Sequence, residues 1–253
     1  MKPKTDQEIE WMTESGQMLA TVLDLLITKA DIGVTPRQLA KIASKELRKL
    51  GGKPAFLGVS SQGLTADYPD VICISVNDQV QHSIPNDRQL TEGDVVNFDF
   101  GVSYRGMITD AGITVGIGKI NSENQRLINA TEQALKQGIA VVRDGTRVGD
   151  VSAAVQKVLD QNKLGIVREL VGHGVGHELH EEPEIPNYGK AGLGPILRSG
   201  MTIAIEPIAN LGSRHIYVDV DGWTIRTEDK SNSAQFEHTI LVTETGSIIL
   251  TKI

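Results

Sequence analysis

The chain has 253 residues, of which 40% are hydrophobic and 23% charged, so it can bury a substantial core and is neither disordered nor fibrous. Its 32 acidic residues outnumber its 25 basic ones, and the formal net charge of -7 argues against nonspecific binding to nucleic acid or anionic membranes. Cys73 is the single cysteine, which excludes an intrachain disulfide and a zinc site built from thiolates.

Two amphipathic helices are predicted near the start of the chain. Thr5 and Glu8 form a capping-box pattern, and apolar residues recur at helical spacing from Ile9 to Leu26. A second helix is expected to start at Thr35 and to end at Gly51.

A second pair of helices is predicted in the middle of the chain. Ser122 and Gln125 match another capping box, and a fourth helix follows Gly145. Residues 33–47 and 145–159 share a turn followed by the same apolar spacing, which indicates two related halves.

Strands are expected after each helix pair. Residues 95–100 and 107–115 flank Tyr104-Arg105-Gly106 and are predicted to form a hairpin. The later strands are expected at residues 201–205, 223–227, 236–242 and 247–250. We therefore expect one α+β domain over residues 1–253, with an internal pseudo-repeat.

Four acidic residues lie in strands whose neighbours are apolar: Asp99, Asp110, Glu206 and Glu237. An ionised carboxylate in such a strand is costly unless a cation offsets its desolvation. Asp99 and Asp110 alone fit a metal site and a structural role equally well, and any single buried acid is more often ion-paired. Four of them, with a histidine cluster between, call for a common cause, and two bridged divalent cations would provide one.

The histidine cluster lies in residues 172–183 and contains His173, His177 and His180. His173 and His177 have the spacing of a helical zinc pair, but the three nearby glycines argue against a helix. A glycine-rich strand or loop that approaches a bound group is the favoured interpretation, and a polar surface loop is the alternative.

A set of four carboxylates and one imidazole suits Mn(II), Fe(II), Co(II) or Zn(II), although Mg(II) and Ca(II) also bind carboxylate-rich sites. Two such ions polarise a carbonyl and generate hydroxide from a bridging water near neutral pH. The residues themselves therefore predict a two-metal hydrolase. We call Asp99, Asp110, His173, Glu206 and Glu237 the ligand candidates.

The order of the ligand candidates resembles that of the methionine aminopeptidases and the wider pita-bread metallopeptidase family. The resemblance is carried by residues 73–77, 95–99, 172–176, 180–183, 205–207 and 233–239. It implies an α+β pita-bread fold with pseudo-twofold symmetry, in the minimal type 1 form. It also implies that Asp99, Asp110 and Glu237 hold one ion, and that Asp110, His173, Glu206 and Glu237 hold the other, with Glu206 as proton shuttle.

The resemblance adds five residues near the substrate. His82 and His180 match two histidines that hydrogen-bond the scissile amide and steady the oxyanion. Tyr68, Cys73 and Trp223 match the wall of a methionine side-chain pocket. From the residues alone, His82 could equally belong to a surface loop, and the three wall residues to the core.

Three departures from the family pattern bear on the shape of this pocket. Ser83 stands where the family often has glycine, Leu179 replaces an aromatic residue, and the loop from Gly58 to Asp67 is longer than in compact bacterial members. None of them touches a ligand candidate.

The function implied is removal of the N-terminal methionine from nascent proteins with a small second residue. The alternatives are a proline-specific aminopeptidase or dipeptidase, and a noncatalytic module that binds ribosomes or nucleic acid. No signal peptide or membrane span of roughly 18 apolar residues is visible. We therefore expect a cytoplasmic monomer that contacts ribosomes transiently and binds no membrane or specific nucleic acid.

Overall fold

The computed structural model describes residues 2–60 and 66–252. In these ranges the helices are α1 (Asp6–Lys29), α2 (Pro36–Leu50), α3 (Ser122–Ala140) and α4 (Val148–Gln161). The capping box predicted at Thr5 is confirmed, and so is the predicted start of α2 at Thr35, which also forms a capping box. The box predicted at Ser122 is wrong by one position, because the side chain of Asn121 accepts from the backbone N of Asn124 and caps α3 instead.

The strands are β1 (Lys53–Pro54), β2 (Cys73–Val76), β3 (Gln79–Gln81), β4 (Val95–Tyr104), β5 (Met107–Gly116), β6 (Gly165–Ile166), β7 (Gly172–Gly174), β8 (Glu181–Ile185), β9 (Thr202–Ile205), β10 (Ile208–Asn210), β11 (Ile216–Val218), β12 (Ile225–Thr227), β13 (Ser233–Gln235), β14 (Glu237–Val242) and β15 (Ser247–Ile249). The predicted β4–β5 hairpin is confirmed. The strand predicted at residues 223–227 begins only at Ile225, because the carboxylate of Asp221 accepts from the backbone N of Trp223 and Thr224 and holds them in a turn.

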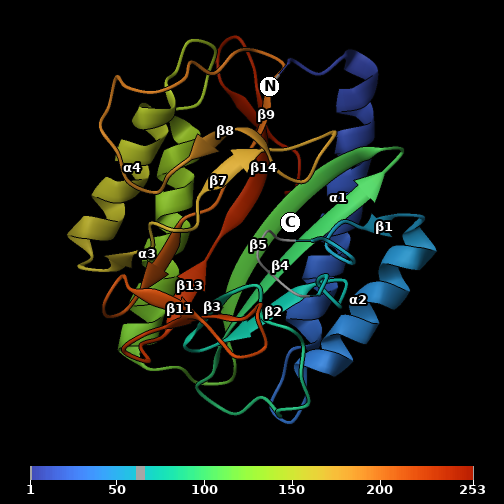
Figure 1. Cartoon of the computed structure of the whole chain (residues 1–253), viewed down its shortest axis with the longest axis vertical. Helices are drawn as coiled ribbons and strands as arrows, with labels where there is room; N and C mark the ends of the chain where they lie inside the picture. The colour runs from blue at the N-terminus through green and yellow to red at the C-terminus, as the bar shows by residue number, and fades with distance from the viewer. Residues whose placement is uncertain (1, 61–65, 253) are drawn as a thin grey trace.

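The largest sheet joins two halves of the chain in the order β1-β4-β5-β14-β9-β7-β8, with β2 paired to β4 and β15 to β14 (Figure 1). All of its pairings are antiparallel. β14 lies between β5 of the first half and β9 of the second half. Two helices precede the strands of each half, in agreement with the predicted repeat.

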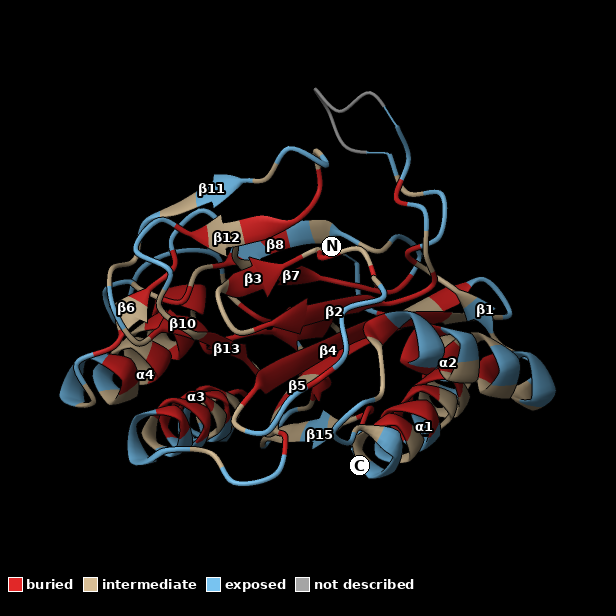
Figure 2. Cartoon of the chain, turned by 90° about the horizontal axis from the view of Figure 1, so that it is seen from below, coloured by how far each residue is buried: buried red, intermediate tan, exposed pale blue. Residues whose placement is uncertain are grey.

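All four helices cover one face of this curved sheet and turn their buried sides toward it (Figure 2). One apolar cluster packs α1 and α2 against β2, β4 and β5, and a second packs α3 and α4 against β9 and β14. Large side chains such as Phe98 and Phe100 are fully buried there, and each contributes roughly 1.5–3 kcal/mol by leaving water. The opposite face of the sheet is therefore the one left open for a site.

No helix among the described residues is both long and apolar enough to cross a membrane.

Candidate metal centre

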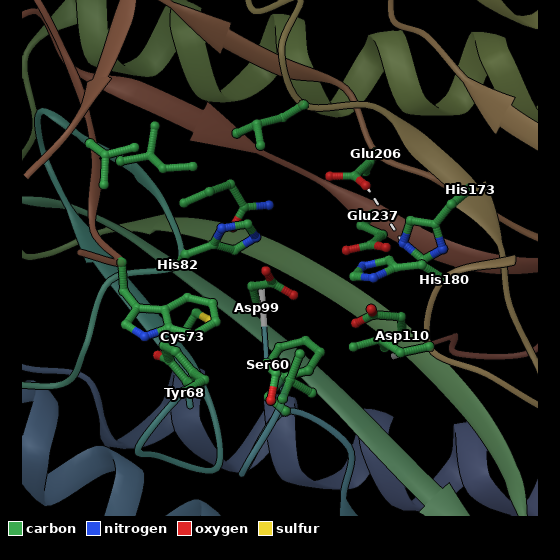
Figure 3. A pocket seen from close by; sticks show the side chains of 18 of the residues that line it. Ser60, Tyr68, Cys73, His82, Asp99, Asp110, His173, His180, Glu206 and Glu237 are labelled. Carbon is green, nitrogen blue, oxygen red and sulfur yellow. Dashed lines mark ion pairs between the residues drawn. The ribbon is translucent and has the colours of Figure 1, made fainter. Parts of the chain in front are cut away.

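A cavity of about 420 Å³ contains every residue predicted for the site. Its lining includes all the ligand candidates, His82 and His180, and the wall residues Tyr68 and Cys73 (Figure 3). The third predicted wall residue, Trp223, also lines it. The chain therefore brings together side chains that are up to 169 positions apart in the sequence, from Tyr68 to Glu237.

Strand register places three of the carboxylates on one face of the sheet. Gly112 of β5 is the direct partner of Asp99 on β4 and of Glu237 on β14. Asp110 lies two residues from Gly112 on β5, so its side chain points to the same face. Because Gly112 has no side chain, the carboxamide of Gln235 can occupy the space above it, between Asp99 and Glu237.

The second half of the chain supplies His173 and Glu206. His173 on β7 pairs with Ala204 of β9, and Glu206 follows the last residue of that strand. The two side chains approach to 3.7 Å between Nε2 and Oε1. Nδ1 of His173 lies 2.8 Å from the carbonyl oxygen of Gly174, so a proton on Nδ1 leaves Nε2 free to bind a cation.

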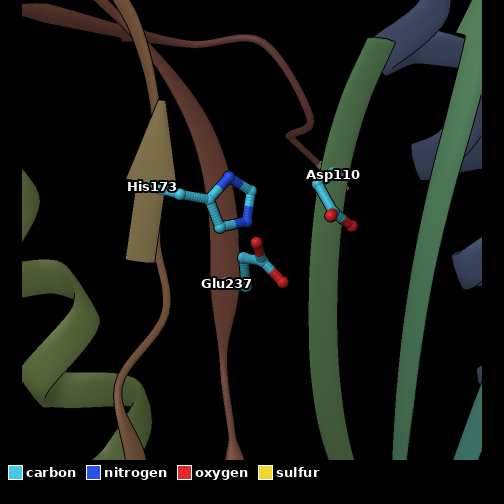
Figure 4. Close-up of side chains that lie close together, drawn as sticks. All are labelled: Asp110, His173 and Glu237. Atoms are coloured by element: carbon cyan, nitrogen blue, oxygen red, sulfur yellow. The ribbon is translucent and has the colours of Figure 1, made fainter. Parts of the chain in front are cut away.

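Asp110, His173 and Glu237 form a compact group of potential metal ligands. One ligand atom from each lies within 4.8 Å of the others, and all three side chains are buried (Figure 4). They come from β5, β7 and β14, and their polar ends point toward one another.

Several carboxylate oxygens of the cavity lack a hydrogen-bond donor among the described residues. They are Asp99 Oδ1, Asp110 Oδ1 and Glu237 Oε1, all fully buried. A buried, unpaired carboxylate oxygen is costly, and a divalent cation offsets that cost directly. The donor set therefore fits metal ions that accept oxygen and imidazole ligands.

The electrostatics of the acids lead to the same conclusion. Burial raises the pKa of Asp110 to about 7. Burial, and then repulsion from neighbouring acids, raises the pKa of Asp99, Glu206 and Glu237 well above the ordinary values. Four acids held this close cannot all ionise at neutral pH unless cations lie among them.

The three histidines of the cavity are kept neutral. Burial, and then the nearby His180, lowers the pKa of His173 to about 3 and that of His82 to about 4, while burial also lowers the pKa of His180. The rings of His173 and His180 are 4.4 Å apart and nearly perpendicular. His177, by contrast, is exposed outside the cavity lining and lies 2.7 Å from Glu8.

The apolar end of the cavity is formed by Tyr68, Cys73 and Trp223, together with Phe56 and Leu179. The rings of Tyr68 and Trp223 meet edge to face with centroids 5.2 Å apart. This wall adjoins the predicted long loop, of which residues 61–65 lie outside the described residues.

Two glutamines near the acids were missed by sequence reasoning. Gln235 donates from Nε2 to Glu237 Oε2 at 2.9 Å and accepts from Asn97 at 2.9 Å. Gln81 lines the cavity, and its carboxamide opposes the rise in the pKa of Asp99 and of Glu206. Each glutamine is one or two positions from a predicted site residue. This nearness in the sequence is the signal that could have identified both glutamines.

A family model, metallopeptidase family M24, matches residues 10–244 of the chain. The chain belongs to this family. The M24 chain is 38% identical to methionine aminopeptidase 1 of Bacillus subtilis over 250 residues, covering 99% of this chain and 98% of the relative. It is 40% identical to the methionine aminopeptidase of Aquifex aeolicus over 252 residues, covering 98% of each.

Solved structures extend the comparison to the fold. A methionine aminopeptidase structure from Thermotoga maritima matches the M24 chain with a TM-score of 0.96 and 40% identity, over 100% of both chains. A prolidase from Pyrococcus furiosus matches with a TM-score of 0.78 and 22% identity, over 99% of this chain and 65% of the prolidase, and shares the fold. The predicted pita-bread fold, the resemblance to methionine aminopeptidases and the assignment as a metal-dependent aminopeptidase are confirmed.

Proposed function

We propose that the chain removes the N-terminal methionine from nascent proteins whose second residue is small, and that it does so with two divalent ions. One observation carries the proposal: a single cavity joins the ligand candidates to a wall of aromatic rings and one thiol. Relatives that align over almost the whole chain and are methionine aminopeptidases support it.

The ligand candidates divide between two ions. Asp99, Asp110 and Glu237 would hold one, and Asp110, His173, Glu206 and Glu237 would hold the other, as Mn(II), Fe(II), Co(II) or Zn(II). When bound, such ions polarise the scissile carbonyl and lower the pKa of a water molecule. The unpaired oxygens of Asp99, Asp110 and Glu237 support cation binding by these three residues.

Glu206 is proposed to move the proton. It is buried at the cavity, 3.7 Å from His173, and burial raises its pKa, so it can take a proton from the attacking water and release it to the leaving amine. His82 and His180, both neutral, would donate hydrogen bonds to the scissile amide and the developing oxyanion.

The wall residues are proposed to select methionine. Tyr68 and Trp223 present ring edges, and Cys73 presents a small sulfur-bearing surface, against which an unbranched thioether packs well. A charged first side chain would lose its hydration in this wall without gaining a partner.

Chelation followed by re-addition of single metals tests the proposal. We expect the metal-free chain to be inactive, and two equivalents of one of the four metals to restore cleavage of Met-Ala-Ser well above that of Met-Leu-Ser and Ala-Pro-Ser. Asp110→Asn should lose activity by at least about 100-fold, because it breaks both sets of ligands. The control is Glu132→Gln, which changes an exposed acid on α3. Faster cleavage of Ala-Pro-Ser, or full activity with one equivalent of metal, would contradict the proposal.

We also propose that the chain acts in the cytoplasm as a monomer in transient contact with ribosomes. Its acidic balance supports a weak contact over a tight one. Sedimentation with ribosomes at rising salt, and analytical ultracentrifugation of the chain alone, test these points.

A further inference from the structure

The backbone of His82 is held in an unfavourable conformation. Its φ is 55°, in the left-handed region, which is unfavourable for a residue with a side chain. Such a conformation persists only where the surroundings fix it. We therefore expect hydrogen bonds to the residues next to His82 to hold its backbone in this conformation.

The carbonyl oxygen of Ser83, the next residue, accepts two hydrogen bonds. The backbone N of Ile74 donates at 3.2 Å and the hydroxyl of Tyr68 at 2.9 Å. The same hydroxyl lies 3.1 Å from the carbonyl oxygen of Ile72. The ring of Tyr68 thus forms part of the cavity wall, while its hydroxyl donates a hydrogen bond to the backbone beside His82.

The side chain of Ser83 makes a third contact. Its hydroxyl accepts from the hydroxyl of Ser75 at 3.0 Å, and both serines are fully enclosed. A buried hydroxyl without a partner is costly, so each serine keeps the other in place. A glycine at position 83, as the family often has, could not form this link.

The ring of His82 has little else to hold it. Its centroid lies 6.5 Å from that of Trp223, and within residues 2–60 and 66–252 no group makes a hydrogen bond to the ring. The direction of the ring therefore depends on the backbone at residues 82 and 83 and on packing against Trp223.

We propose that Tyr68, Ser75 and Ser83 are positioning residues that aim His82 at the scissile amide. We call these three residues the His82 anchor. The inference rests on the proposed function, because it assumes that His82 contacts substrate. The anchor acts through the peptide that joins residues 82 and 83, and its loss would let His82 relax to an ordinary φ and turn its ring away.

Three single substitutions test the anchor while leaving the rings of the cavity wall in place. Tyr68→Phe keeps the ring and removes the hydroxyl, while Ser83→Ala and Ser75→Ala each cut the link between the serines. The matched control is Ser15→Ala, which removes a buried hydroxyl that donates to Val102 at 2.9 Å and pairs with Thr109 at 2.9 Å, away from the cavity lining.

With Met-Ala-Ser as substrate, the anchor variants should lose about tenfold or more in kcat while KM stays within about twofold, because a displaced group costs rate more than binding. Ser15→Ala should keep the kcat of the unaltered chain even if its Tm falls as far as the Tm of the anchor variants. A drop in kcat for Ser15→Ala equal to that of the anchor variants would overturn the proposal, since general destabilisation would then explain both.

The histidine ring resonances of the metal-free protein give a second readout. A ¹H–¹⁵N spectrum, with the His82 signals assigned by their loss in His82→Gln, should show those signals shifted or broadened in Tyr68→Phe and Ser83→Ala, and unchanged in Ser15→Ala. If His82→Gln is inactive but the anchor variants keep both kcat and the ring signals, the anchor is refuted and the proposed function stands. If His82→Gln is fully active, the role of His82 in the proposed function fails, and the purpose of the anchor fails with it.

Discussion

The carboxamide of Gln235 fills the space that a side chain at Gly112 would occupy. A Cβ atom at position 112 would collide with the carboxamide oxygen and carbon of Gln235. The same carboxamide donates to Glu237, and Gly112 is the strand partner of both Asp99 and Glu237. The glycine and the glutamine therefore set the orientation of a ligand candidate together.

Substitution of Gly112 is predicted to weaken metal binding without removing a ligand. Gly112→Ala displaces Gln235 and leaves Glu237 without its donor, and loss of a group that orients a ligand typically costs 10–100-fold in affinity. Calorimetric titration of the metal-free protein with Mn(II) measures the change. The control is Gly246→Ala in the turn before β15, where a methyl group meets no atom within 4 Å. Equal affinity of the Gly112 variant and the unaltered chain would refute the role of this pair.

Metal binding is predicted to release protons. Burial raises the pKa of Asp110 to about 7 and those of Asp99, Glu206 and Glu237 well above ordinary values, so below neutral pH these groups hold protons in the metal-free protein. A cation must displace those protons, so its apparent affinity falls as the pH falls from 8 to 6.

Calorimetry at pH 6.5 in two buffers of different ionisation enthalpy counts the protons. We expect at least about one proton per chain for Mn(II). The same titration of Asp110→Asn should release fewer. A heat that does not depend on the buffer would show that the acids are already ionised, contrary to the prediction.

The ion pair between Lys4 and Glu181 is predicted to stabilise the turn that carries His180. Nζ of Lys4 lies 2.9 Å from Oε2 of Glu181, and the lysine side chain is fully enclosed. Lys4→Met leaves Glu181 without its cation and should lower the free energy of unfolding by about 2–3 kcal/mol in urea denaturation. Lys136→Met, in the exposed pair with Glu132 on α3, should cost less than about 0.5 kcal/mol.

The Lys4 pair also has a defined pH dependence. Burial alone would raise the pKa of Glu181, but the hydrogen bonds from Lys4 and from the backbone N of Glu178 and His177 outweigh it and lower the pKa. A lowered pKa means that the stabilisation is present above the unfolded value and is lost as the pH falls through the folded one. The difference in stability between Lys4→Met and the unaltered chain should therefore shrink on acidification. A constant difference would contradict the pairing.

Cys73 is predicted to resist alkylation in the native protein. Burial, and then the charge of Asp99, raises the pKa of its thiol, and the thiolate is the reactive form. Iodoacetamide at pH 8 should label the native chain far more slowly than the chain in guanidinium chloride, as followed by intact mass. Similar rates in both states would mean that the cavity wall opens readily.

Local signals in the sequence were enough for much of the fold. Thr5 and Thr35 are followed by the residue types of a capping box, and the β4–β5 hairpin is marked by its apolar strands and turn. The site acids were predictable because a carboxylate stands out in an apolar strand.

Other features depend on contacts that no local pattern encodes. Asn121 and Ser122 are both able to cap α3, and only the chain geometry decides that Asn121 does. The hydroxyl of Tyr68 could have faced substrate, but it bonds to a carbonyl 15 positions away. Gln235 accepts a hydrogen bond from Asn97, which is 138 positions away in the sequence.

The central position of β14 in the sheet has a consequence for folding during synthesis. Asp99 and Asp110 are synthesised well before Glu237, and β14 must insert between β5 and β9 to bring them together. A partly synthesised chain therefore carries the ligand candidates of its two halves separately, and they form no complete site until β14 pairs with both β5 and β9. Peptidase activity would thus be withheld from partly made copies of the protein.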